Sequence, residues 1–139
     1  MRKGIRLAGA ILLLVVLLVT SVGVASAAPR DPFRGVWYAV DVDSSNMKMV
    51  FSGGGVSRRM LWQDDYWSIC AGGPGIGRGT GEVDGDTLHA TVDVYCGGAL
   101  AGTFDMDFTY DSGTGTLLNH VFVVPPVDVT WYRHWKLIP

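Results

Sequence analysis

Apolar and polar residues alternate in short runs along most of the chain after residue 34. The run 102–110 shows the pattern best, with Phe104, Met106, Phe108 and Tyr110 at every second position. The run 87–95 alternates in the same way, with Leu88, Ala90, Val92 and Val94 at the apolar positions. Alternation with a period of two indicates strands that bury one face and expose the other. No segment after residue 28 has the apolar spacing of an amphipathic helix.

Clusters of Gly, Asp, Ser and Asn separate these runs and are typical of tight turns. We expect strands at 35–42, 47–52, 56–63, 66–70, 76–83, 87–95, 102–110, 116–124 and 129–135. Short strands joined by tight turns, without helices, predict an all-β fold, an antiparallel up-and-down meander of about eight strands. Such a meander either closes into a barrel or packs as a sandwich.

The first 27 residues have the composition of a secretory signal peptide. Basic residues at 2, 3 and 6 precede an apolar run over 7–19, and Ala25-Ser26-Ala27 supplies a small-residue cleavage site. The apolar run is shorter than the roughly 20 residues of a membrane-spanning helix. We therefore expect cleavage after Ala27, a single domain over 28–139, and a secreted or extracytoplasmic location in the periplasm or outside the cell. A chain that keeps the segment would be membrane-anchored.

Removal of the first 27 residues would change the charge balance of the chain and leave both cysteines in the mature domain. Without the first 27 residues, eight Lys and Arg face 13 Asp and Glu, so the domain is acidic. An acidic domain lacks the basic patch that nucleic acids need, and the two members of the doublet Arg58-Arg59 point to opposite faces of a strand. Cys70 and Cys96 are the only cysteines, and in an exported chain a single pair predicts a disulfide.

The residues that carry catalysis or bind metals lack the required spacing. His89, His120 and His134 form no zinc motif, and no nucleophile elbow is present. The glycine-rich segment 73–81 precedes a strand, whereas a phosphate-binding loop precedes a helix. Asp105 and Asp107 share one strand face, but the alternation turns that face to solvent. We therefore expect no enzyme, no metal site and no cofactor.

The turn at Asp84-Gly85 predicts a register for the hairpin around it. In that register Gly77, Gly79 and Gly81 lie opposite Val92, Ala90 and Leu88, respectively. Paired residues share a face, so the three glycines face the core and leave a groove in its wall. Three explanations remain open: large side chains such as Trp62 and Trp67 fill the groove, the sheet bends sharply there, or a ligand occupies it.

The two ends of the mature chain resemble the calycin superfamily, which includes lipocalins, fatty-acid-binding proteins and avidins. The first strand opens with Gly35-Val36-Trp37-Tyr38, and Arg133 follows Thr130-Trp131-Tyr132 near the end. The resemblance implies a small closed barrel whose first and last strands pair. It also implies that Arg133 stacks over Trp37, so that Gly35, Trp37 and Arg133 are structural residues.

The resemblance and the alternation disagree about the first strand. The resemblance points Trp37 inward together with Ala39 and Asp41. The alternation instead favours a core face made of Val36, Tyr38, Val40 and Val42. If Trp37 points inward, these four residues form an outer apolar stripe that needs cover from residues 29–33 or from a partner.

Two functions of different classes remain open. The first is a lipocalin-like barrel that binds a small apolar or amphipathic molecule, with Gly77, Gly79, Gly81, Trp62 and Trp67 as candidate ligand contacts. The second is a secreted protein-binding module without a small ligand, for example a protease-inhibitor-like barrel. An unfilled interior favours the first, and a packed interior favours the second.

Overall fold

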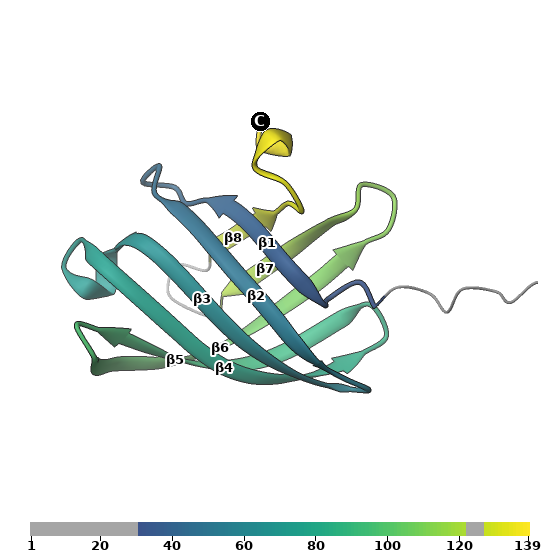
Figure 1. Cartoon of the computed structure of the whole chain (residues 1–139), viewed down its shortest axis with the longest axis horizontal. Helices are drawn as coiled ribbons and strands as arrows, with labels where there is room; N and C mark the ends of the chain where they lie inside the picture. The colour runs from purple at the N-terminus through teal and green to yellow at the C-terminus, as the bar shows by residue number, and fades with distance from the viewer. Residues whose placement is uncertain (1–30, 122–126) are drawn as a thin grey trace, which may run out of the picture. The chain divides into compact units, whose positions relative to one another are not determined.

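Eight antiparallel strands form one sheet in the computed structural model, which describes residues 31–121 and 127–139. In chain order they are β1 (Gly35–Val40), β2 (Asn46–Gly54), β3 (Ser57–Trp67), β4 (Gly73–Asp84), β5 (Thr87–Cys96), β6 (Ala99–Asp111), β7 (Thr116–Val121) and β8 (Val127–Trp131). Two short 3-10 turns, η1 (Ser68–Cys70) and η2 (Trp135–Leu137), complete the described chain. Each strand pairs with the next one, which confirms the predicted meander (Figure 1).

The sheet curls until its first and last strands meet. Tyr38 on β1 and Tyr132 just after β8 exchange two backbone hydrogen bonds, each 2.8 Å long. This isolated bridge is the one pairing between the two ends of the sheet within the described residues. The protein is therefore a nearly closed barrel rather than a fully closed one, and the sandwich alternative is excluded.

Some strand boundaries differ from the predicted ones. The expected separate strand at 66–70 does not form, because Tyr66 and Trp67 complete β3 and the next three residues form η1. Ala71 follows η1 with a left-handed φ of 52°, which turns the chain into β4. The last expected strand, 129–135, is instead Val127–Trp131, and the expected end of the preceding strand, 122–124, lies outside the described residues.

The register of the hairpin between β4 and β5 differs from the predicted one by two residues. Gly85 and Asp86 form the turn, so Asp84 pairs with Thr87. Gly85 has a φ of 59° and takes the first turn position, where a two-residue hairpin with a positive φ favours glycine. A shift of two residues preserves the faces, so the glycines still point inward. Gly77, Gly79 and Gly81 lie opposite Val94, Val92 and Ala90.

The first strand turns its tryptophan inward. Trp37 and Ala39 are fully buried, whereas Val40 and Val42 are 40% and 85% exposed. The orientation implied by the resemblance is correct, and the alternation was misleading because it counts apolar residues without weighing the larger apolar surface of an indole ring. Phe33 does not cover the outer stripe as expected. It is buried in the core, and Trp135 of η2 packs on Tyr38 instead, with 4.8 Å between the ring centroids.

Large buried side chains gather at the end of the barrel where β1 begins and β8 ends. Phe51 and Phe108 meet edge to face there, with their ring centroids 5.2 Å apart. The other fully buried large side chains include Phe33, Trp37, Trp131, Leu88 and Leu117. This closed end contrasts with the opposite end, where the interior is partly empty.

The inward glycines of β4 have two physical explanations. A Cβ atom at Gly77 would lie 3.0 Å from Val92, 3.2 Å from Trp62 and 3.4 Å from Trp67, so these three side chains fill the space. A Cβ atom at Gly79 or Gly81 would lie 2.5 Å from a backbone carbonyl oxygen of β5. The β5 backbone lies so close to these two glycines that it leaves no room for a side chain.

Replacing Gly79 with Ala is therefore expected to destabilise the protein by about 1–3 kcal/mol, because the strands must separate to admit the methyl group. Gly54→Ala is the matched control, since nothing lies within 4 Å of a Cβ atom at that position. Urea denaturation of the two variants measures the difference. Equal midpoints for Gly79→Ala and the parent would show that the strands do not approach so closely.

Candidate functional site

A cavity of about 500 Å³ opens at the end of the barrel opposite the packed core. This mouth cavity has mainly apolar walls, with aromatic rings on β3 and β6 and methionines on β2 and β6. Asp41 and Ser68 are the polar residues of its lining. The apolar lining residues are Val42, Met47, Trp62, Trp67, Ile69, Phe104, Met106, Val121, Val127 and Val129.

Two tryptophans form one wall of the mouth cavity. Trp62 points inward from β3 and lies directly opposite Gly77 on β4. Trp67 follows an irregularity in the pairing of β3 with β4, and its ring centroid lies 4.7 Å from that of Trp62. A Cβ atom at Gly75 would lie 2.4 Å from the Trp67 ring, so the glycines of β4 leave room for this indole.

The candidate ligand contacts from the sequence therefore divide into two groups. Trp62 and Trp67 line the mouth cavity. Gly77, Gly79 and Gly81 do not line it, although Gly77 lies next to both rings. The sequence analysis did not assign Met47, Asp41 or Ser68 to a site. The inward orientation of Trp37 was the available indication for Asp41, because positions 37, 39 and 41 share a face in an extended chain.

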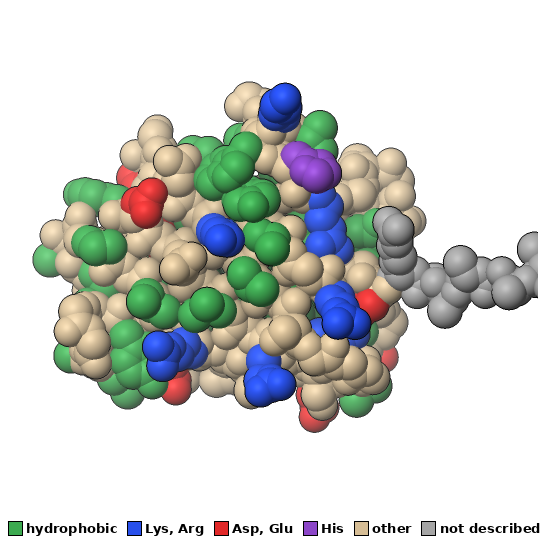
Figure 2. All heavy atoms as spheres, in the orientation of Figure 1, with side chains coloured by type: hydrophobic (Ala, Val, Ile, Leu, Met, Phe, Trp, Pro, Cys, Tyr) green, Lys and Arg blue, Asp and Glu red, His purple; other side chains and the backbone are tan. Residues whose placement is uncertain are grey.

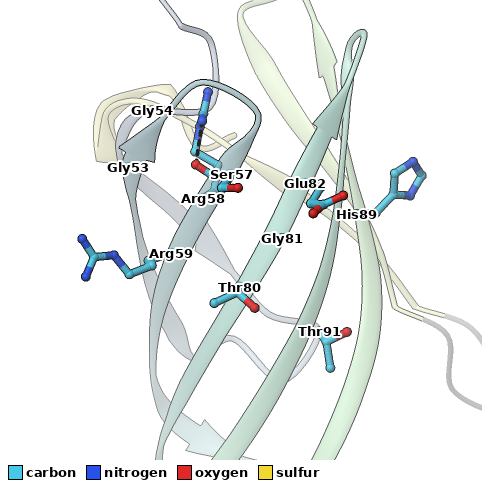
Figure 3. A pocket seen from close by; sticks show the side chains of 10 residues that line it. All are labelled: Gly53, Gly54, Ser57, Arg58, Arg59, Thr80, Gly81, Glu82, His89 and Thr91. Atoms are coloured by element: carbon cyan, nitrogen blue, oxygen red, sulfur yellow. Dashed lines mark hydrogen bonds between the residues drawn. The ribbon is translucent and has the colours of Figure 1, made fainter.

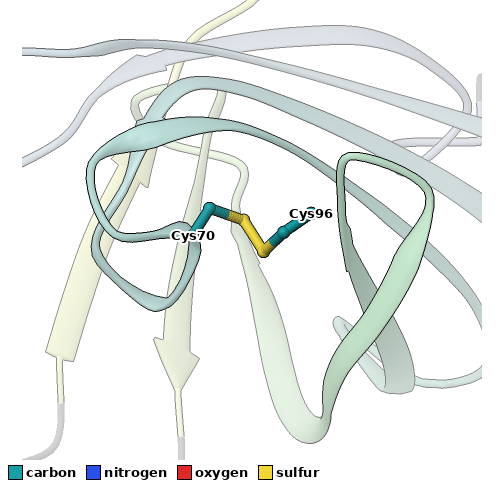
Figure 4. Close-up of a disulfide and its surroundings, with 2 residues drawn as sticks. All are labelled: Cys70 and Cys96. Atoms are coloured by element: carbon teal, nitrogen blue, oxygen red, sulfur yellow. A yellow bond between two sulfur atoms is a disulfide. The ribbon is translucent and has the colours of Figure 1, made fainter.

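A disulfide holds the loop between β3 and β4. Cys70 in η1 is bonded to Cys96 at the end of β5, with their Cα atoms 5.3 Å apart (Figure 4). The predicted pairing is confirmed. Since Ser68 and Ile69 precede Cys70 and line the mouth cavity, the bond fixes one side of its rim.

A buried carboxyl group lies near the rim. Asp64 is 2% exposed, and its Oδ1 accepts hydrogen bonds from the Ser45 hydroxyl at 2.9 Å and the Tyr66 backbone N–H at 3.0 Å. Its Oδ2 has no hydrogen-bond partner among the described residues. Burial raises the pKa of Asp64, and the nearby charges of Asp41 and Asp43 raise it further, although the two hydrogen bonds act in the opposite direction.

This environment predicts a pH-dependent contribution to stability. A carboxyl group whose pKa is raised by folding binds a proton more tightly in the folded state than in the unfolded state. Its contribution to the free energy of unfolding therefore becomes more favourable as the pH falls toward the ordinary pKa of 3.8. The free energy of unfolding of Asp64→Asn, minus that of the parent, should therefore increase from acidic to neutral pH. Urea denaturation at several pH values between acidic and neutral pH measures this difference, and Asp65→Asn, at an exposed position, is the control. A flat difference for Asp64→Asn would contradict the assignment.

The closed end carries the contact that the resemblance implies. The Arg133 guanidinium lies 3.8 Å from the centroid of the Trp37 ring. Its Nη1 donates to the backbone oxygen of Arg34 at 2.8 Å, and Nη2 donates to that of Pro32. Gly35 has a φ of 116°, and a Cβ atom there would lie 2.7 Å from Arg133 Nη1. These contacts connect the start of β1 to the segment after β8, far along the barrel from the mouth cavity.

A second depression lies on the outer wall near the closed end. This outer groove of about 670 Å³ crosses β2 to β5 and is lined by polar side chains and glycines. Arg59 and His89 point away from each other on the convex wall (Figure 3). Because these side chains diverge, the outer groove offers a ligand few groups that act together, and the mouth cavity is the stronger candidate site.

The other polar candidates lie on the outer face. His89 Nδ1 and Asp107 Oδ1 form a hydrogen bond of 2.7 Å, and Asp105 accepts a hydrogen bond from Thr91 at 2.7 Å. Arg58 points inward and pairs with Asp31, whereas Arg59 is exposed, so the doublet does divide between two faces. No group of three His, Cys, Asp or Glu residues within the described ranges is placed to hold a metal ion.

An apolar surface covers the outside of the first three strands. Val36, Val50 and Leu61 lie opposite one another on β1, β2 and β3. Hydrophobic side chains gather on this side of the molecule (Figure 2). We call Val36, Val50 and Leu61, together with the adjacent Tyr38 and Ile76, the outer apolar face.

The fold and the mouth cavity define the class: a small, nearly closed, eight-stranded antiparallel barrel with one disulfide in its described part and an apolar mouth. Comparisons of the chain with protein-family models, with curated proteins and with solved structures find no match. In the part of the chain that the structure describes, no helix has the length and apolar character needed to cross a membrane.

Proposed function

We propose that the protein is a secreted, lipocalin-like barrel that binds a small apolar or amphipathic molecule in the mouth cavity. The observation that carries the proposal is the unfilled space of about 500 Å³ bounded by aromatic and methionine side chains. Ligand sites are typically concave and mainly apolar, with a few polar groups that orient the ligand. Methionine side chains adapt to the shape of the bound molecule. The proposed role is binding without catalysis.

Two further features support a calycin-like, exported protein. The Arg133 guanidinium stacks on Trp37 and Gly35 makes room for it, as the resemblance implies. The disulfide between Cys70 and Cys96 is of a kind that persists in oxidising compartments, which agrees with the proposed signal peptide.

The test has two parts. Native mass spectrometry of the exported protein should reveal a retained small molecule. The neutral dye N-phenyl-1-naphthylamine should become fluorescent when it enters the mouth cavity. Val127→Phe, which adds a ring to the cavity wall, should weaken dye binding about tenfold, equivalent to about 1.4 kcal/mol. Val56→Phe is the control, because Val56 is exposed and does not line the mouth cavity. If the parent protein binds no dye and retains no molecule, the proposal fails.

The outer apolar face favours a second candidate function, a protein-binding module. Leu61 and Ile76 are each 39% exposed, and exposed apolar patches often mark protein interfaces. This candidate gains support if the mouth cavity binds no small molecule. In that case Leu61→Lys should abolish partner binding without changing the free energy of unfolding by more than about 0.5 kcal/mol.

A further inference from the structure

We infer that the molecule held in the mouth cavity is a cation, with an ammonium group beside Asp41 at the rim and an apolar body against Trp62 and Trp67. This inference rests on the proposed function and specifies the class of ligand. It is carried by the position of one carboxylate, by the charge around it and by the aromatic character of the cavity wall.

The turn between β1 and β2 fixes Asp41 at the edge of the mouth cavity. Its backbone N–H donates to Ser45 O at 3.0 Å, and its carbonyl oxygen accepts from the Ser44 N–H at 2.9 Å. Its Oδ1 accepts a bond from the Val42 N–H at 2.7 Å. The carboxylate is therefore oriented before a ligand arrives. No described group donates to the second carboxylate oxygen, which leaves it available to a ligand.

Among the residues that the structure describes, no basic side chain forms an ion pair with the aspartates at the rim. Asp41 and Asp43 both act electrostatically on the buried Asp64. The ion pairs between described residues join Arg58 to Asp31, His89 to Asp107 and His120 to Asp128, and none includes these three aspartates. Like charges close together destabilise one another, so a bound cation would relieve the repulsion. An anionic ligand would increase it.

The wall of the mouth cavity suits an organic cation better than a metal ion. The Trp62 and Trp67 rings lie 4.7 Å apart at 40° and offer flat apolar surfaces with electron-rich faces. Trp62 is 5% exposed, and its indole N–H has no hydrogen-bond partner among the described residues. Asp41 is half-buried, so an ammonium group beside it keeps part of its hydration.

The experiment uses three probes that share one body: 2-(1-naphthyl)ethylamine, 2-(1-naphthyl)ethanol and 1-naphthylacetate. Isothermal titration calorimetry of the exported protein at pH 7 and low salt measures each affinity. We expect the amine to bind at least tenfold more tightly than the alcohol, and the carboxylate to bind most weakly. Asp41→Asn keeps an oxygen for the Val42 N–H but removes the charge. It should reduce the affinity for the amine about tenfold and leave that for the alcohol unchanged.

Asp84→Asn is the matched control, because Asp84 is exposed at the closed end of the barrel, and it should leave all three affinities unchanged. Equal binding of amine and alcohol, or an equal effect of the two variants, overturns the inference while the proposed function stands. If none of the probes binds and the neutral dye also fails to bind, the proposed function fails, and the inference fails with it.

Discussion

Replacing Trp37 with Ala should lower the free energy of unfolding by about 3–5 kcal/mol, because the change leaves a large cavity in the core at the closed end of the barrel. The Trp37 side chain is fully buried. Its ring contacts the Arg133 guanidinium at 3.8 Å and the Tyr110 ring edge to face at 6.5 Å between centroids. Its indole N–H points to the backbone oxygen of Phe33 at 3.4 Å. Urea denaturation followed by far-ultraviolet circular dichroism measures the loss.

Two conservative variants separate packing from the contact with arginine. Trp37→Phe keeps an aromatic ring and should cost less than Trp37→Ala. Arg133→Lys keeps the charge but loses the planar group that donates to the backbone oxygens of Arg34 and Pro32. The free energy of unfolding of both variants should lie between that of the parent and that of Trp37→Ala. A Trp37→Ala variant as stable as the parent would mean that the closed end is not held together by this ring.

The strands were predictable from the sequence wherever one face is buried and the other face is exposed to solvent. The inward face of β6 carries Phe104, Met106 and Phe108, and its outward face carries Asp and Thr, so the alternation could be read directly. The same reasoning failed on β1, where Val36 and Tyr38 lie on the outer apolar face. When both faces of a strand carry apolar residues, the alternation does not show which face is buried. On β1 only the large side chain of Trp37 indicates the core face.

The sequence predicts which face of a strand is buried better than it predicts the pairing register between two strands. The predicted turn at Asp84-Gly85 and the observed turn at Gly85-Asp86 contain the same glycine, and the two registers put the same side chains on the same face. The sequence therefore indicated that Gly79 faces inward without indicating its neighbours. The reason for that glycine is a β5 carbonyl oxygen 2.5 Å from where its Cβ would lie, a close approach that depends on the three-dimensional path of both strands.

The mouth cavity itself was beyond sequence reasoning. An empty volume is what remains after all side chains from opposite walls have been placed, and no local pattern encodes that remainder. Trp62 and Trp67 were proposed to fill the space above the glycines, and they do lie beside Gly77. They also border the empty space. Trp131 of β8 meets the Trp62 ring edge to face, with 5.5 Å between the centroids, whereas Val127 and Val129, the β8 side chains that line the mouth cavity, are smaller.

Removing the disulfide between Cys70 and Cys96 should lower the free energy of unfolding by about 3.5 kcal/mol, the chain-entropy value for a loop of about 27 residues. The double variant Cys70→Ala/Cys96→Ala, compared with the parent under oxidising conditions, measures this loss. Treating the parent with a reductant should produce a similar loss and should leave the double variant unchanged, which controls for side effects of the reductant.

The same variant should affect the mouth cavity more than the closed end. The bond holds η1, and Trp67, Ser68 and Ile69 lie at or just before it in the cavity wall. Without the bond this side of the wall is held mainly by the packing of Trp67 on Trp62. Hydrogen exchange should therefore accelerate at residues 67–72 and remain slow at 35–39, where Arg133 packs on Trp37. A uniform acceleration over both segments would contradict a local role for the disulfide and would indicate that it acts only on the unfolded chain.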